Sequence, residues 1–107
     1  MDAVERQFAA YNARDVEAFV ACFSDGVVFE DAAGGLLARG TGELRQQYGP
    51  MFRDRPDLRA EVTVRERFGE YVVDVEVVTG LGPAPVRGVA IYHLGEDGLI
   101  DHVRFVR

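Results

Sequence analysis

The spacing of apolar residues predicts helices in the first half of the chain. Up to residue 23 they recur every three or four positions, which is the period of an amphipathic helix. We expect one helix that begins after Asp2 and is broken at residues 12–14, and a second that begins at Asp15. Ser24 to Gly26 should end the second helix, with Gly26 in a left-handed conformation.

A third helix is predicted from Thr41 onwards, after two short strands at residues 27–31 and 36–39. Pro50 lies inside this helical pattern. Because proline lacks a backbone N–H and crowds the preceding turn, we expect it to kink the helix or end it early.

From residue 57 the apolar period changes to two, which is typical of strands with one buried face. Four consecutive antiparallel strands, joined by hairpin turns, are predicted over residues 58–65, 71–79, 86–94 and 99–107. In the second of them Val73, Val75 and Val77 alternate with acidic residues, and we expect the valines to face inward. Helices that precede such a sheet indicate an α+β fold with the helices packed on one sheet face.

The last two predicted strands are apolar on both of their alternating faces. In the first of them Ala90 and Tyr92 lie on one face, and Val89 and Ile91 lie on the other. Such a strand needs cover on both sides. Since the helices cover one side, we expect a second copy of the chain to cover the other, giving a homodimer through the outer sheet face.

Length, composition and charge narrow the possible functions. A chain of 107 residues indicates a single domain over residues 1–107. All 12 basic residues are arginine, which excludes a lysine Schiff base and a lysine general base. The net charge is −6 and there is no basic cluster, which excludes nucleic acid as a partner. We expect no association with a membrane, because no apolar run is long enough to span one. The lone Cys22 fits a cytoplasmic location.

Several strings along the chain resemble a known family. They are FAAYNARD at residues 8–15, FSD at 23–25, VFED at 28–31 and RGTG at 39–42, followed by the closing segment 98–105. Together they resemble the nuclear transport factor two-like superfamily, and more narrowly its SnoaL-like and ketosteroid-isomerase-like members. The resemblance spans essentially the whole chain. It implies a cone, in which a strongly curved antiparallel sheet wraps three helices and leaves a blind apolar pocket between them.

The resemblance implies a general base at Asp31. In ketosteroid isomerases the catalytic aspartate follows a glutamate at the end of this strand, and Glu30–Asp31 matches that position. An aspartate in an apolar pocket has a raised pKa, as proton abstraction next to a carbonyl requires. The alternative is a turn-starting aspartate that accepts a hydrogen bond from the amide of Ala33 or Gly34.

The resemblance also implies two groups that polarise the substrate oxygen, a tyrosine and a protonated aspartate in the isomerases. The matching positions are Gln7 and Tyr92, which differ from the family's residues but can donate through an amide and a hydroxyl. The alternatives are a surface glutamine and a core tyrosine whose hydroxyl bonds the backbone.

The remaining pocket wall is expected from the first helix, the third helix and the concave sheet face. Its predicted residues are Tyr11, Met51, Phe52, Val73, Val75, Val77, Ala90, Val103 and Phe105. The charged strand residues are expected outside, in cross-strand ion pairs: Arg65, Arg67, Asp74, Glu76, Arg87 and Arg104. His93 and His102 should also point away from the pocket, so neither a metal nor a cofactor is expected.

These features predict a domain that binds a small apolar ligand. If it is an enzyme, proton transfer next to a carbonyl is the expected reaction, as in isomerases and cyclases, with Asp31 as base. The alternative is a non-catalytic ligand-binding domain, or a dimeric structural domain, of the same fold.

Overall fold

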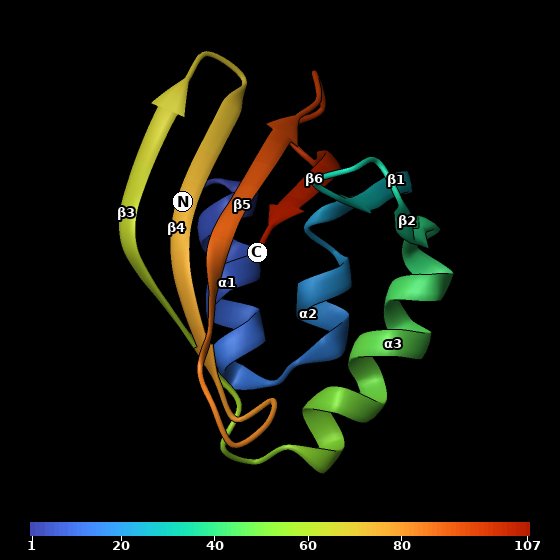
Figure 1. The fold of residues 1–107 in the computed structure, drawn as a ribbon. Helices are drawn as coiled ribbons and strands as arrows, with labels where there is room; N and C mark the ends of the chain where they lie inside the picture. The colour runs from blue at the N-terminus through green and yellow to red at the C-terminus, as the bar shows by residue number, and fades with distance from the viewer.

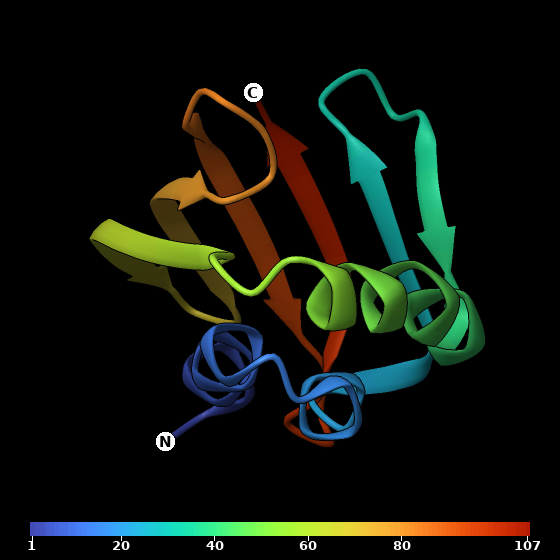
Figure 2. The same cartoon turned by 90° about the horizontal axis from the view of Figure 1, so that it is seen from below.

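The computed structural model describes residues 1–107. The elements follow in the order α1 (Ala3–Ala13), α2 (Val16–Val20), β1 (Phe23–Asp31), β2 (Leu36–Arg39), α3 (Gly40–Asp54), β3 (Arg59–Phe68), β4 (Tyr71–Thr79), β5 (Val86–Leu94) and β6 (Ile100–Val106). The three helices lie on the concave side of one curved, unclosed sheet (Figures 1 and 2). The predicted α+β cone is confirmed.

Helix α1 begins and ends where the sequence predicted. The Asp2 carboxylate accepts a hydrogen bond from the N–H of Glu5, and the Glu5 carboxylate accepts one from the N–H of Asp2. This reciprocal pair satisfies backbone donors that a helix start leaves free. Arg14 then ends the helix in the left-handed region, with a φ of 53°.

Helix α2 is shorter than expected, because strand β1 already begins at Phe23. Ser24 to Gly26 therefore lie within a strand, and Gly26 does not have a positive φ. Phe23 pairs with Ile100 of β6, and the register between these strands shifts before Val28. The three residues form this irregularity in the sheet, and the prediction that they end a helix was wrong.

Helix α3 continues through Pro50 as far as Asp54, so the proline does not end it early. Leu44 and Phe52, on either side of the proline, are both buried in the core. Tertiary packing on both sides of Pro50 compensates for the hydrogen bond that the proline cannot make. No helix of the structure combines the length and the apolar character that crossing a membrane requires.

The strands lie in the order β2-β1-β6-β5-β4-β3. The sheet is antiparallel, as predicted, except at one junction, where β1 and β6 run parallel. The sequence could not predict this junction, because turn residues indicate only the pairing of strands that are consecutive in the chain. β1 and β6 are separated by most of the sequence. The junction brings Phe29 of β1 beside Val103 of β6, on the concave side.

The inward face of β4 is the opposite of the one expected. Val72, Asp74, Glu76 and Val78 are buried on the concave side, whereas Val73, Val75 and Val77 face outward. Apolar residues occur on both faces of this strand, so its alternation does not decide which face is inside. We expected the charged residues to face water. Instead, Asp74 and Glu76 are buried, and each is paired with an arginine.

Candidate functional site

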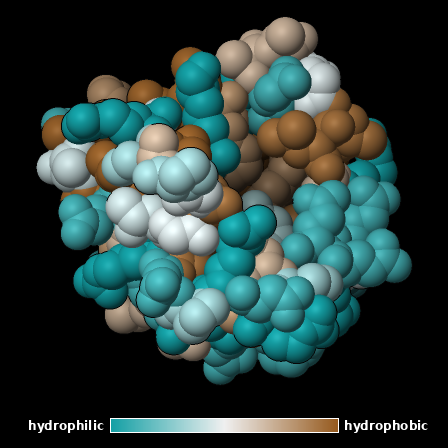
Figure 3. Space-filling view, turned by 60° about the horizontal axis from the view of Figure 1, so that its bottom comes forward, coloured by the Kyte–Doolittle hydropathy of each residue, from teal (hydrophilic) through white to brown (hydrophobic).

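A cavity of about 190 Å³ lies between the helices and the concave face of the sheet. Sixteen residues line it, and twelve of them are hydrophobic. A hollow bordered by hydrophobic residues is visible between more polar surfaces in Figure 3. A concave, mainly apolar space with a few polar groups is the usual form of a small-molecule site.

Aromatic rings form most of the cavity wall. The ring of Tyr11 stands edge-on to that of Tyr48, with 6.4 Å between their centroids, and Phe19 lies 4.7 Å from Tyr48. On the sheet side, Phe29 and Phe105 form another edge-on pair at 5.8 Å. Rings that pack on one another in this way hold the wall in a fixed shape.

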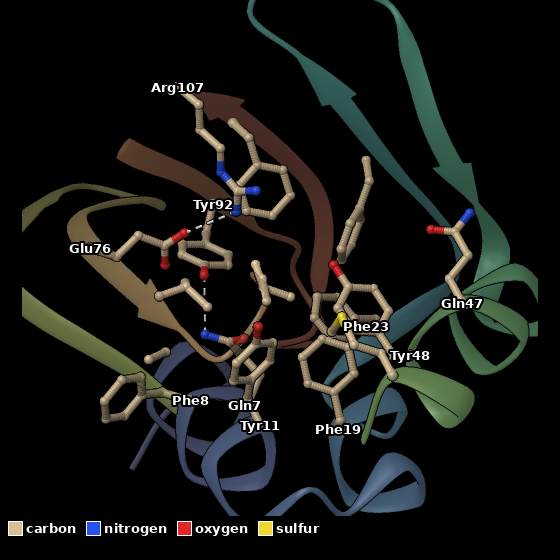
Figure 4. Close-up of a pocket in the computed structure, with 16 residues that line it drawn as sticks. Gln7, Phe8, Tyr11, Phe19, Phe23, Gln47, Tyr48, Glu76, Tyr92 and Arg107 are labelled. Atoms are coloured by element: carbon tan, nitrogen blue, oxygen red, sulfur yellow. Dashed lines mark hydrogen bonds and ion pairs between the residues drawn. The ribbon is translucent and has the colours of Figure 1, made fainter. Parts of the chain in front are cut away.

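The carboxylate that lines the cavity belongs to Glu76 (Figure 4). The residue is 8% exposed, and burial raises the pKa of its carboxyl, an effect that the positive charge of Arg107 opposes. Nη2 of Arg107 donates to Oε1 of Glu76 over 3.4 Å, which is the long end of the hydrogen-bond range. The guanidinium of Arg107 also lies over the Phe105 ring, 4.7 Å from its centroid.

A second carboxylate, Asp74, lies two residues away on the same strand face and is 1% exposed. Arg65 of β3 donates to it twice, from Nε over 2.7 Å and from Nη2 over 2.9 Å. A bidentate pair of this kind satisfies the aspartate. Asp74 does not line the cavity, which leaves Glu76 as the carboxylate within it.

Gln7 and Tyr92, the predicted polarising groups, both line the cavity and contact each other. Nε2 of Gln7 donates to the Tyr92 hydroxyl over 3.2 Å and to the backbone oxygen of Val4 over 3.0 Å (Figure 4). Burial, followed by the nearby charge of Glu76, raises the pKa of Tyr92 well above its usual value. The Gln7 amide therefore has both of its protons engaged within the protein.

Tyr11 and Tyr48 direct their hydroxyls into the cavity (Figure 4). Burial and the charge of Glu76 raise the pKa of Tyr11 to about 12, and burial also raises the pKa of Tyr48. Both hydroxyls thus keep their protons at neutral pH and can donate to an oxygen held in the cavity.

Asp31 lies outside the cavity lining, at the end of β1. Its Oδ1 accepts hydrogen bonds from the backbone N–H of Ala33 over 3.0 Å and of Gly35 over 2.8 Å. A β-carbon at Gly35 would lie only 2.6 Å from the other carboxylate oxygen. This is the geometry of the turn-starting aspartate that the sequence left as the alternative.

The other predicted lining residues fall into three groups. Tyr11, Met51 and Phe105 line the cavity. Phe52, Ala90 and Val103 are buried in the core but are not part of the lining. Val73, Val75 and Val77 face the outside of the sheet, because the inward phase of β4 is the one that carries Asp74 and Glu76.

Glu76 and Arg107 were not predicted as cavity residues, and Arg65, Asp74 and Glu76 were predicted on the outside of the sheet. A bulge in β3 between Val62 and Val64 contributes to the error, because it changes which residues of that strand face inward. Val64 is therefore 48% exposed, and Arg65 lies opposite Asp74. Val72 and Val78 make the acidic face apolar at both ends, but Val73 and Val77 balance them on the other face, so the sequence held no decisive signal.

The two histidines are held by carboxylates on the outer face. His93 lies 2.6 Å from Asp101 and 3.1 Å from Glu70, and His102 lies 2.6 Å from Glu30. Hydrogen bonds to Asp101 and Glu70 raise the pKa of His93. Neither histidine lines the cavity.

The sequence matches the model of a known protein family. The model of a SnoaL-like domain matches residues 4–103. The chain belongs to the SnoaL-like domain family. No curated protein matches this SnoaL-like chain in sequence.

Solved structures share the fold of this SnoaL-like domain. An uncharacterised cystatin-fold protein from Novosphingobium aromaticivorans is 27% identical, with 98% of this chain and 95% of that chain covered and a TM-score of 0.88. A proposed polyketide cyclase from Sinorhizobium meliloti is 20% identical over 96% and 92% of the two chains, at a TM-score of 0.81. A computationally designed 17-OHP binder is 18% identical over 96% and 88%, at 0.82. Identities this low establish the fold and leave the chemistry to the cavity.

Proposed function

We propose that this protein binds a small, ring-containing and mainly apolar molecule in its cavity. The observation that carries the proposal is a fixed aromatic wall around a space of about 190 Å³ with one carboxylate in it. The size suits a molecule of one or two rings, since sites for drug-sized ligands begin at about 300 Å³. A designed protein of this fold is a 17-OHP binder, which supports a small-molecule site in this fold.

We further propose that Glu76 removes a proton next to a carbonyl of the bound molecule. The reaction class is the one predicted from the sequence, but the base moves from Asp31 to Glu76. Asp31 is occupied by its turn, whereas Glu76 is buried, faces the cavity and has a raised pKa. The C–H proton passes to the Glu76 carboxylate, and the C–H electron pair forms an enolate whose oxygen accepts hydrogen bonds from Tyr11 and Tyr48.

Exchange of ketone protons for deuterium tests both steps. 2-Tetralone, a two-ring ketone with acidic C–H groups, is incubated with the protein in D₂O and followed by proton NMR. We expect Glu76→Gln to slow the protein-dependent exchange by about 100-fold, because amides are not general bases. Asp31→Asn is the matched control and should leave the rate within about twofold.

Each other outcome has a definite meaning. If Asp31→Asn abolishes exchange and Glu76→Gln does not, the base is Asp31 and the assignment to Glu76 is wrong. If the protein binds 2-tetralone without accelerating exchange, it is a binding domain and the catalytic part of the proposal fails. If 2-tetralone does not bind at all, the cavity does not serve ligands of this class.

We also propose that two copies of the chain pair through the outer sheet face. Val64, Val75, Val89 and Val106 lie opposite one another in register across β3, β4, β5 and β6, all facing outward. Three of these valines are at least 38% exposed, which is unusual for a strip of adjacent strands in a monomer. Val73 and Ile91, also in register, widen the strip. A self-complementary strip of this kind suits a two-fold dimer.

A further inference from the structure

The charges of the cavity differ in how firmly they are held. Glu76 lies within the interior strand β4, and its side chain is 10% exposed. The Arg107 side chain, after the end of β6, is 42% exposed. The negative charge is therefore fixed in the sheet, whereas the positive charge can move out into solvent without breaking the core.

The contrast with the neighbouring pair shows how weakly Arg107 is attached. Arg65 holds Asp74 with two hydrogen bonds of 2.7 and 2.9 Å, and its side chain is 23% exposed. Arg107 holds Glu76 with one bond of 3.4 Å. A long, half-exposed ion pair contributes little to stability.

The space that Arg107 fills is made by a glycine. Gly88 of β5 lies opposite Glu76, and a β-carbon at this position would lie 2.5 Å from the backbone oxygen of Val106 and 2.7 Å from Cγ of Arg107. The absence of a side chain at position 88 leaves room for the end of β6, so that Arg107 reaches between Glu76 and the Phe105 ring. A carboxylate on one side and an aromatic face on the other are the two groups that attract a cation.

From this arrangement we propose that the molecule bound by the cavity carries a protonated nitrogen, an ammonium or amidinium group, which takes the place of Arg107 between Glu76 and Phe105. The inference rests on the proposed binding function alone, independently of the proton transfer, and adds the charge of the ligand to it. An anion would lie against the fixed carboxylate, and a neutral group would leave that carboxylate without a counter-charge once Arg107 had moved.

Three ligands that share a 1-naphthylmethyl body test the proposal: 1-naphthylmethylamine, 1-naphthalenemethanol and the anion of 1-naphthaleneacetic acid. They differ in charge and share a two-ring apolar body. Isothermal titration calorimetry at pH 7 should give at least about tenfold tighter binding of the amine than of the alcohol, with the acid weakest. Arg107→Ala should strengthen binding of the amine severalfold relative to the alcohol, because the residue that competes with the amine for Glu76 is removed.

The decisive variant is Glu76→Gln, which should reduce the preference for the amine over the alcohol to within about twofold. The matched control is Glu61→Gln, which removes the same charge from the outer face of the sheet, where Glu61 is exposed opposite Val77. It should keep the full preference. Because the preference is a ratio measured within one variant, a change in the folded fraction does not affect it.

The outcomes separate this inference from the binding function. Equal binding of amine and alcohol by the unmodified protein overturns the inference and leaves the cavity as a site for neutral molecules. A preference that survives Glu76→Gln, or tightest binding of the acid, also overturns it. If none of the three ligands binds, the proposed binding function itself is wrong.

Discussion

Asp74 and Glu76 lie two residues apart on the same face of β4, yet only Asp74 is held by a bidentate ion pair. Asp74 receives two short hydrogen bonds from Arg65, and Glu76 receives one long one from Arg107. We therefore expect Asp74 to matter for stability and Glu76 for the proposed function, because removing one partner of a buried ion pair is destabilising, whereas a weakly held carboxylate is available to a ligand. Each of these expectations can be measured.

Asp74→Asn should destabilise the protein by about 3 kcal/mol, because it leaves the partly buried guanidinium of Arg65 without a counter-charge. Urea denaturation at pH 7 measures the change. The control is Asp54→Asn, which breaks the exposed pair between Asp54 and Arg53 and should leave the midpoint unchanged. Similar midpoints for Asp74→Asn and the unmodified protein would show that the Arg65–Asp74 pair does not contribute to stability.

Glu76→Gln should have the opposite effect and stabilise the protein above neutral pH. The pKa of Glu76 is raised in the folded protein, so the folded state binds a proton more tightly than the unfolded state does. The energetic cost of ionising Glu76 is therefore absent below its ordinary pKa of 4.5 and fully present above its raised folded value. Gln removes this cost, so urea denaturation should show no gain near pH 4 and a gain at pH 8. A gain that is the same at both pH values would contradict the raised pKa.

The burial of Asp74 and Glu76 could not be predicted from the sequence, although most of the fold could. The order of helices and strands, the antiparallel hairpins and the cone could be predicted, because periodicity and turn residues act locally. The inward face of β4 could not be predicted, because both faces of this strand carry valines. Val72 and Val78 lie on one face, and Val73 and Val77 lie on the other. Only the pairing with β3, including its bulge, and with Arg107 decides between them.

The residues of the candidate site could also be predicted only in part. Gln7, Tyr11 and Tyr92 were placed at the cavity by resemblance and helical spacing, and they do line it. Asp31 matched the family's base by position, but its role depends on where the turn after β1 directs the carboxylate. A match of residue type at a motif position does not specify that direction.

Asp31→Ala should lower the free energy of unfolding by about 1 kcal/mol, since it removes two hydrogen bonds to the turn amides. Binding of ligands in the cavity should be unchanged, because Asp31 does not line it. Urea denaturation and calorimetric titration of 2-tetralone measure the two effects. Loss of ligand binding in a folded Asp31→Ala variant would contradict the assignment of Asp31 to the turn.

His93 should make stability fall as the pH rises above neutral. Hydrogen bonds to Asp101 and Glu70 raise the pKa of His93 above 6.5. The resulting stabilisation is fully present below pH 6.5 and is lost as the pH rises through the folded pKa. Histidine ring signals followed by NMR should titrate above 6.5 for His93, and His93→Gln should reduce the stability difference between pH 6 and pH 9. An unchanged difference would assign the pH dependence to other groups.

Val75→Asp should convert the proposed dimer into a monomer. Val75 lies in the middle of the outward strip, between Val64 and Val89, and is 38% exposed in the isolated chain. A carboxylate there would be buried without a partner in the dimer but solvated in the monomer, so the charge destabilises only the pairing. Sedimentation velocity should give a dimer for the unmodified chain at micromolar concentration and a monomer for Val75→Asp. Leu37→Asp, at a 46% exposed position of the edge strand β2, is the control and should leave the dimer intact, whereas a monomeric unmodified chain would refute the pairing.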